Sequence, residues 1–183
     1  MADYKNLSLN QLLNYKSDNA AWYGLGMAYM EAYDVENAIF WLDKTMNDAG
    51  NEWQTKATFE LAQVYMADGH PKSSKDEALR LLMKVSSYGI SQVNIGFLLY
   101  FGTETQIDTK KGRSYIEGGI KLLKERDGMN SLGSYDLLRV AWMYQDEGEK
   151  GKAREYLQAT ISKSSAEGFY DIKEQAEECL REL

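Results

Sequence analysis

One stretch near the start of the chain decides the fold: residues 22–42 read WYGLGMAYMEAYDVENAIFWL. Trp22, Leu25 and Tyr29 are three and four positions apart, which places them on one face of a helix. Ala38 follows thirteen residues after Leu25 and begins a second apolar helical face. The stretch therefore predicts two helices that approach closely at small residues, while aromatic side chains fill the flanks.

The same helix-pair pattern recurs along the 183-residue chain. Its anchors, each a large apolar residue followed by a small one, are Leu25-Gly26, Leu61-Ala62, Ile95-Gly96 and Val140-Ala141. The first and fourth units align without a gap, whereas the two middle units have four more residues between their anchors, which we expect in the loop between the helices. An internal repeat of this kind predicts a stacked array of helical hairpins.

These residues resemble the tetratricopeptide repeat family, whose signature is an aromatic residue, Leu-Gly and Tyr in the first helix, then Ala with a large apolar residue in the second. The two middle repeats are similar to the Sel-one-like repeat, through Gly69, Gly102 and the run at residues 108–112. The resemblance implies an all-α fold. It would be an alpha-alpha superhelix, a right-handed solenoid of about four helix pairs with extra N- and C-terminal helices.

We expect a single helical-repeat domain over residues 1–183. The repeats would occupy approximately residues 18–48, 52–87, 89–125 and 130–164, with a short extra helix at 8–16 and a C-terminal capping helix at 166–182. Four side chains have the character of helix N-caps and mark expected helix starts: Asp34, Ser74, Asp108 and Ser164. The glycines at 112, 118 and 119 are expected to weaken the second helix of the third repeat by about 1 kcal/mol each.

Composition restricts the classes of function. The formal net charge of -7 argues against nucleic-acid binding, which depends on Lys and Arg. The single cysteine, Cys179, cannot form an intrachain disulfide or a multi-cysteine metal site. The most apolar run, residues 95–101, is too short to span a membrane, and the chain opens without a secretory signal, so we expect a cytoplasmic protein.

No set of residues predicts catalysis, and neither a metal nor a cofactor is implied. His70 is the only histidine and precedes the only proline, which is typical of a turn. Gly24 and Gly26 lack the third glycine and the strand–helix context of a dinucleotide-binding loop. Cys179 lies among glutamates, which disfavour a reactive thiolate. An enzyme that uses a carboxylate such as Glu60 is retained as the less favoured alternative.

In the resembled family, the first helix of each repeat lines a concave groove. The resemblance implies that this groove binds a protein or peptide partner through a surface rich in aromatic and methionine side chains. The positions that correspond are Tyr23, Met27, Met30, Phe59, Gln63, Met66, Asn94, Phe97, Tyr100, Arg139, Trp142 and Gln145. The same groups could instead pack between neighbouring first helices or beneath the N-terminal helix. Of the carboxylate clamp of chaperone-binding members, only Asn94 and Arg139 fit.

The predicted function is therefore a non-enzymatic scaffold or adaptor that binds a partner in an apolar groove. One alternative is an inhibitor or immunity-type protein that blocks a basic partner through an acidic surface. The expected C-terminal helix carries six acidic and two basic residues between positions 167 and 182, which suits either a polar cap or such a surface. A homodimer formed through exposed repeat faces is a further alternative.

Overall fold

The structure of the chain is a computed structural model that describes residues 4, 7–49, 51–103 and 106–183. Throughout that part of the chain the regular elements are helices, and it contains no strand. In chain order the α-helices are α1 Leu9–Leu12, α2 Asn19–Glu31, α3 Val35–Asp48, α4 Asn51–Met66, α5 Lys75–Lys84, α6 Gly89–Phe101, α7 Thr109–Leu122, α8 Ser134–Asp146, α9 Lys150–Glu167 and α10 Tyr170–Glu182. The predicted all-α fold class is confirmed.

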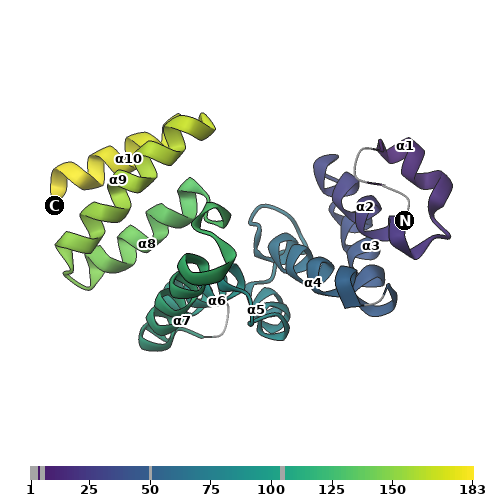
Figure 1. The fold of residues 1–183 in the computed structure, drawn as a ribbon, viewed down its shortest axis with the longest axis horizontal. Coiled ribbons are helices and arrows are strands. Elements are labelled where there is room, and N and C mark those ends of the chain that lie inside the picture. The colour runs from purple at the N-terminus through teal and green to yellow at the C-terminus, as the bar shows by residue number, and fades with distance from the viewer. Residues whose placement is uncertain (1–3, 5–6, 50, 104–105) are drawn as a thin grey trace. The chain divides into compact units, whose positions relative to one another are not determined.

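Three short elements complete the list: the 3₁₀ turns η1 Leu13–Tyr15 and η3 Met129–Ser131, and the π-helical turn η2 Leu123–Asp127. The chain divides into two compact units, unit 1 with Met1–Ser87 and Thr103–Thr105, and unit 2 with Tyr88–Gly102 and Gln106–Leu183. Helices pair within each unit as α2 with α3, α4 with α5, α6 with α7 and α8 with α9, and α10 packs on α9 (Figure 1). The helical hairpins predicted from the repeat are therefore present.

The loops between paired helices carry the predicted insertions. The turns of the first and fourth hairpins are short, at residues 32–34 and 147–149. The middle hairpins have longer connections, at residues 67–74 and 102–108. Their extra residues lie between the helices, as the spacing of the anchors indicated.

Three of the four predicted N-caps are confirmed. Asp34, Ser74 and Asp108 each accept a hydrogen bond from the backbone N–H three residues further on, at 3.2, 3.3 and 2.9 Å. These bonds satisfy amide groups that have no partner inside the first turn of a helix. The starts of α3, α5 and α7 are thus encoded locally.

The predicted helix start at Ser164 is wrong. Helix α9 continues through Ser164 to Glu167, and the Ser164 hydroxyl donates to the Ile161 carbonyl at 3.2 Å instead of capping a new helix. The break comes at Gly168, whose φ of 79° is a left-handed conformation that glycine adopts without steric cost. The C-terminal helix therefore begins at Tyr170 rather than at residue 166.

A close approach of α6 and α7 shapes unit 2. A Cβ atom on Gly119 would lie 2.6 Å from the Gly89 carbonyl oxygen, and one on Gly96 would lie 2.7 Å from the Gly112 carbonyl oxygen. Gly89 and Gly96 are seven residues apart on α6, and Gly112 and Gly119 are seven residues apart on α7. The two helices are antiparallel, so these glycines lie along one line of contact between them. The loss of helix propensity expected from the α7 glycines stays a prediction, while the close contact gives Gly112 and Gly119 a packing role that the sequence did not reveal. Gly118 would meet only the side chain of Gln92, at 3.1 Å.

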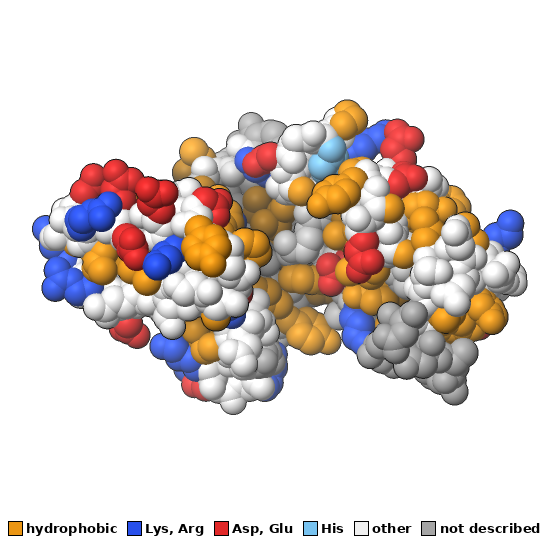
Figure 2. Space-filling model, turned by 90° about the horizontal axis from the view of Figure 1, so that it is seen from above, with side chains coloured by type: hydrophobic (Ala, Val, Ile, Leu, Met, Phe, Trp, Pro, Cys, Tyr) orange, Lys and Arg blue, Asp and Glu red, His pale blue; other side chains and the backbone are white. Residues whose placement is uncertain are grey.

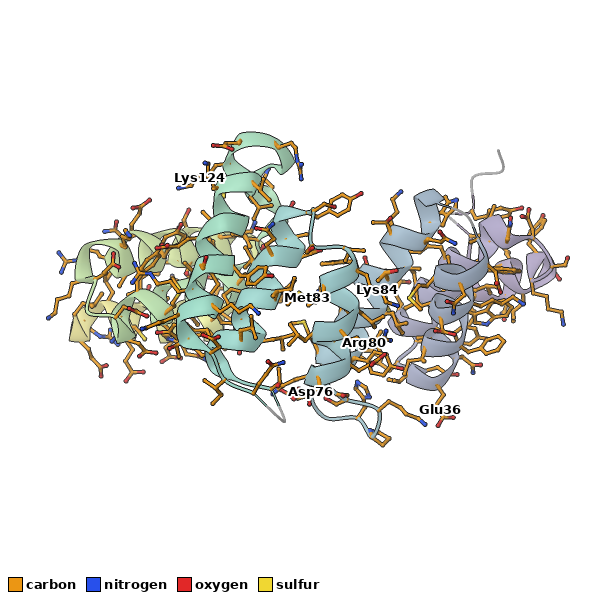
Figure 3. The ribbon with its side chains drawn as sticks, turned by 90° about the horizontal axis from the view of Figure 1, so that it is seen from below. Glu36, Asp76, Arg80, Met83, Lys84 and Lys124 are labelled. Carbon is orange, nitrogen blue, oxygen red and sulfur yellow. The ribbon has the colours of Figure 1, made fainter. Side chains whose placement is uncertain are left out.

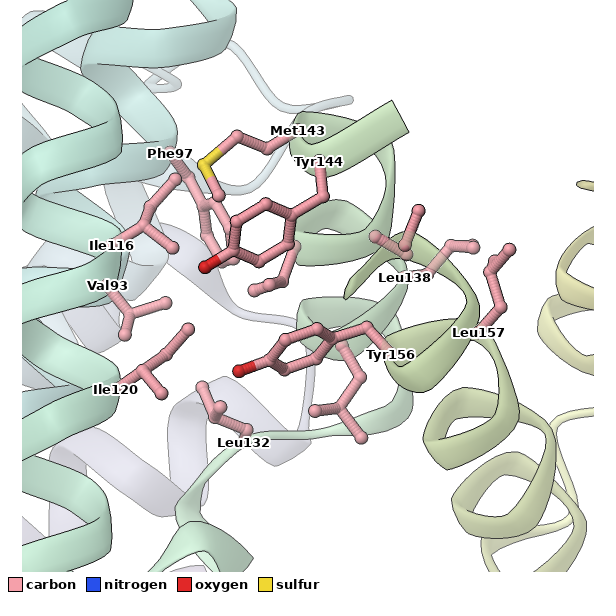
Figure 4. Packing of buried hydrophobic residues seen from close by; sticks show 14 of the residues in the cluster. Val93, Phe97, Ile116, Ile120, Leu132, Leu138, Met143, Tyr144, Tyr156 and Leu157 are labelled. Carbon is pink, nitrogen blue, oxygen red and sulfur yellow. The ribbon is translucent and has the colours of Figure 1, made fainter. Parts of the chain in front are cut away.

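The core of unit 2 joins both hairpins to α10. Figure 4 shows the Tyr144 and Tyr156 rings lying against each other with their hydroxyls directed toward Ile116 and Ile120 of α7; the ring centroids are 5.6 Å apart. The Tyr144 hydroxyl donates to Glu117 at 3.3 Å. Burial of these aromatic and aliphatic side chains supplies the main stabilisation of the unit.

A second core in unit 1 lies under the N-terminal segment. Leu12 of α1 and Leu25 of α2 are buried together with Trp41 of α3. A Cβ atom on Gly24 would lie 3.3 Å from a methyl group of Leu12, so α1 packs directly on α2. The short extra helix predicted at the N-terminus therefore covers the first hairpin.

Candidate partner-binding surface

The predicted groove residues of unit 1 lie on α2 and α4 and are all half-buried. They are Tyr23, Met27, Met30, Phe59, Gln63 and Met66. The Tyr23 ring lies 5.2 Å from the Trp53 ring, and its hydroxyl donates to Glu60 at 3.5 Å. The Gln63 amide nitrogen is buried without a hydrogen-bond partner among the described residues. Part of the predicted lining of unit 1 thus packs within the unit, which is the alternative that the sequence left open.

Glu60 and Tyr23 share a poorly solvated environment. Burial raises the pKa of the Glu60 carboxyl, and the hydrogen bond from Tyr23 opposes that shift. Burial, together with the nearby carboxylate, raises the pKa of Tyr23 to about 12. Glu60 is therefore biased toward its neutral form. This carboxyl has an acceptor role toward a phenol, and no second carboxyl, histidine or thiol contacts it among the described residues.

Three predicted groove residues of unit 2 belong to its core. Phe97 is 0% exposed, Asn94 4% and Tyr100 8%. The Tyr100 hydroxyl donates inward to the Met143 carbonyl at 3.4 Å. Side chains with so little accessible surface cannot line an open groove in this conformation. The prediction of a lining role is therefore corrected for these three residues, because α6 is buried along most of its length.

An exposed aromatic cluster nevertheless lies on α6 and α8 of unit 2. The Arg139 guanidinium carbon is 4.0 Å from the centre of the Phe97 ring, 5.3 Å from that of Phe101 and 5.8 Å from that of Tyr135. The Trp142 ring meets Tyr135 edge-on, with centroids 6.3 Å apart. Phe101 and Tyr135 are 40% and 50% exposed. We call the accessible members, Phe101, Tyr135, Arg139 and Trp142, the α6–α8 aromatic surface.

Geometry explains the chemistry of this surface. The planar guanidinium of Arg139 rests on the negative face of Phe97, so a buried ring supports a charged group at the surface. Tyr135, Arg139 and Trp142 are four and three residues apart, which places them on one side of α8. Gln145, the remaining predicted residue, follows three positions later and is half-buried. The arrangement suits contact with apolar or aromatic groups of another molecule.

Sequence reasoning predicted Arg139 and Trp142 but missed Phe101 and Tyr135. The lining positions taken from the resembled family run from two residues before the first anchor residue of each repeat to five residues after it. Phe101 lies six residues after the anchor Ile95, and Tyr135 lies five residues before the anchor Val140, so both fall outside this range. The spacing of four between Phe97 and Phe101, and between Tyr135 and Arg139, was the signal available. A search of α6 and α8 for aromatic or arginine residues four positions apart would have predicted the cluster.

A separate charged network fixes the hairpins of unit 2 on another side of α7. Arg113 pairs with Glu117 at 3.2 Å, with Glu147 at 3.0 Å, and with Glu149. Lys152 joins Glu149 at 2.8 Å. These hydrogen bonds to carboxylates raise the pKa of Arg113 and lower the pKa of the Glu149 carboxyl. The network is satisfied internally, so we assign it to the connection between hairpins.

No group of three or more His, Cys, Asp or Glu side chains among the described residues is arranged to hold a metal ion. None of the described helices combines the length and apolar character that crossing a lipid bilayer requires.

Comparison with solved structures finds chains of similar fold. No protein-family model matches the chain, and no curated protein matches it. The crystal structure of the MamA protein, which is tetratricopeptide-like, superimposes with a TM-score of 0.54 at 20% sequence identity, covering 90% of this chain and 84% of that chain. Similarity at this identity concerns the fold alone, and the Sel-one-like character of the middle repeats stays a prediction. The fold is a tetratricopeptide-type helical repeat of the alpha-alpha superhelix class.

Proposed function

We propose that this protein is a non-enzymatic scaffold that binds a segment of a partner protein through the α6–α8 aromatic surface. The single observation that supports the proposal most is the exposure of Phe101 and Tyr135 beside the stacked Arg139. Exposed aromatic and arginine side chains are the groups that most often dominate protein interfaces. Helical-repeat folds of this type generally serve as scaffolds for protein partners.

The proposed partner segment carries an apolar or aromatic side chain. Trp142 and Tyr135 offer two rings at nearly right angles, 89° apart, which would contact an inserted side chain on two sides. Arg139 would cover the same group with its guanidinium plane. An amphipathic helix or an extended apolar segment would present such a side chain.

The test is affinity capture from the native cell, followed by mass spectrometry, with a matched pair of double variants. Phe101→Ala/Tyr135→Ala removes the two most exposed rings of the surface. Phe169→Ala/Tyr170→Ala is the control, because these residues form the same pair of types in unit 2, at 51% and 74% exposure, and lie at the start of α10. We expect proteins captured by the wild type to be retained by the control and lost with the Phe101/Tyr135 variant. Equal capture by both folded variants would exclude this surface.

The inhibitor or immunity-type function is kept as a second candidate because of α10. Asp171, Glu174, Glu178 and Glu182 are all exposed on that helix, while its apolar side, with Ala176 and Leu180, packs on the core. An acidic stripe of this kind would attract a basic partner, and its capture would weaken steeply with added salt. Capture that is insensitive to salt would favour the aromatic surface.

The proposal includes three properties that follow from composition and fold class. We infer a cytoplasmic location, partners that are proteins rather than nucleic acids or membranes, and no cofactor. A homodimer is proposed as an alternative assembly through exposed repeat faces. Sedimentation at several concentrations distinguishes it from a monomer.

A further inference from the structure

One turn position differs between the first repeat and two of the others. In the register of the repeats, the eighth residue after the anchor is Tyr33 in the first repeat, Gly69 in the second and Gly148 in the fourth. Their φ angles are 58°, 90° and 73°, all in the left-handed region. Glycine occupies this region without steric cost, whereas a tyrosine there is strained. The first repeat therefore has a bulky residue where the second and fourth repeats have glycine.

Tyr33 is not held at this strained position by burial of its side chain in the core. Tyr33 is 92% exposed, which is the highest value among the large hydrophobic residues exposed in the described part of the chain. Its ring has no aromatic or cationic neighbour among the described residues. A residue that is strained and also leaves an aromatic ring in water lowers stability, so its presence indicates a role outside the fold itself.

A cavity of about 500 Å³ lies beside this ring, entirely within unit 1. It is formed by the α2–α3 turn together with the loop between α4 and α5, and its walls include Tyr33, Val35, Glu36, His70, Pro71 and Lys72. Figure 2 shows His70, the single pale-blue side chain, at the surface with hydrophobic and charged groups close by. The site is thus a hollow with apolar walls and a charged rim.

The wall at His70 is fixed by two hydrogen bonds. Nε2 lies 2.8 Å from the Val64 carbonyl oxygen, and Nδ1 accepts from the Lys72 backbone N–H at 3.2 Å. Because Nδ1 is an acceptor, the proton is on Nε2 in this arrangement. Both ring nitrogens are therefore engaged, which leaves the imidazole as a rigid wall rather than a donor to a ligand.

The charges around the cavity favour a cation. Both Asp34 oxygens already bind Asn37, at 3.2 and 2.8 Å, so Asp34 serves the helix cap. Glu36, in the first turn of α3, is exposed and projects away from the helices (Figure 3). Lys72 is the only base among the residues that line the cavity, against these two acids. Glu36 has no hydrogen bond or ion pair with another residue that the structure describes, so its carboxylate near the exposed ring can pair with a ligand.

We propose that the cavity between the α2–α3 turn and the α4–α5 loop binds an arginine side chain of a partner protein, with the guanidinium stacked on Tyr33 and paired with Glu36. A guanidinium is planar, stacks on aromatic faces and is more weakly hydrated than an ammonium, which suits a hollow with apolar walls. The site does not depend on the α6–α8 aromatic surface, since its residues all belong to unit 1. Either proposal can fail without the other.

The test uses the only histidine as a reporter. The full-length protein is titrated with N-acetyl-arginine amide at constant pH and ionic strength, and the His70 ring C–H signal is followed by NMR. N-acetyl-citrulline amide, which has nearly the same shape without the charge, is the control ligand. We expect a saturable shift with the arginine compound and a much smaller shift with the citrulline compound.

Three variants assign the shift to the site. Tyr33→Gly should abolish it while the protein melts at the same or a higher temperature, because glycine relieves the left-handed strain. Tyr33→Phe should retain the shift, and Phe40→Ala, at another exposed aromatic residue of unit 1, should leave it unchanged. The proposal is overturned by an absent shift, by an equal shift with citrulline, or by a shift that survives in Tyr33→Gly.

Discussion

At the scale of single residues, Glu60 shows how burial changes a side chain that sequence reasoning could only describe as acidic. The carboxyl of Glu60 accepts from Tyr23 in unit 1, and removal from water raises its pKa. The folded protein therefore binds more protons at this site than the unfolded chain does. By linkage, the free energy of unfolding falls as the pH rises from the ordinary glutamate pKa, about 4.3, through the raised native value.

Substitution of Glu60 by glutamine should remove this dependence. Gln keeps an oxygen to accept from Tyr23 but carries no charge to desolvate, so we expect Glu60→Gln to be more stable than the wild type at pH 7 and closer to it at pH 4. Urea unfolding of both proteins at the two pH values measures the difference. Glu31→Gln, at an exposed glutamate of α2, is the control. A gain no larger at pH 7 than at pH 4 would contradict the burial argument.

The candidate site illustrates what residue patterns can and cannot reveal. Arg139 and Trp142 were predicted from their positions relative to the anchor of the fourth repeat, and both are half-buried. Phe97 has the same kind of position on α6, yet it is a core residue because that helix is covered on nearly every side. The sequence of α6 is apolar on all sides, which is typical of a buried helix. This apolar character predicts the burial of Phe97 better than its position in the repeat does.

At the scale of helices, the α6–α7 hairpin shows why a glycine count misleads. The sequence could predict both helices and the Asp108 cap, because these depend on residues close in the chain. It could not show which glycines face a neighbour, because that depends on the pairing of two helices. The seven-residue spacing in α6 matches the spacing between Gly112 and Gly119, and the structure brings the two sets together.

Two adjacent glycines of α7 should respond in opposite ways to alanine. Gly119→Ala forces a methyl group against the backbone of α6, so we expect a loss of about 1–3 kcal/mol in the free energy of unfolding. Gly118→Ala meets only a flexible side chain and should gain about 0.5–1 kcal/mol from helix propensity. Chemical denaturation of both variants gives the comparison. Equal stabilities would show that α6 and α7 do not approach as closely as described.

At the scale of the whole molecule, the repeat predicts the helical hairpins but does not predict whether they unfold cooperatively. Repeats are stabilised by their contacts with neighbouring repeats, and such contacts depend on side chains that the repeat pattern does not specify. The chain divides into two compact units, while the repeat predicts a single domain. Cooperative unfolding is the property that distinguishes the two organisations.

Calorimetry of Gly119→Ala tests that single-domain prediction. If all hairpins unfold together, a substitution in α7 lowers the temperature of the whole transition, by about 2–4 °C for each kcal/mol lost in a chain of this size. We expect one transition in the wild type and one in the variant. Two separate transitions, of which the substitution moves only one, would show that the units unfold independently.

The central claim is that Phe101 and Tyr135, beside Arg139, form the surface that binds a partner. Its most direct test is the dissociation constant of the captured partner for purified wild type, Phe101→Ala/Tyr135→Ala and Phe169→Ala/Tyr170→Ala. We predict that the Phe101/Tyr135 variant binds at least about tenfold more weakly, since central aromatic residues of an interface cost more than about 1 kcal/mol each, while the control binds like the wild type. Unchanged affinity in a correctly folded Phe101/Tyr135 variant would contradict the claim.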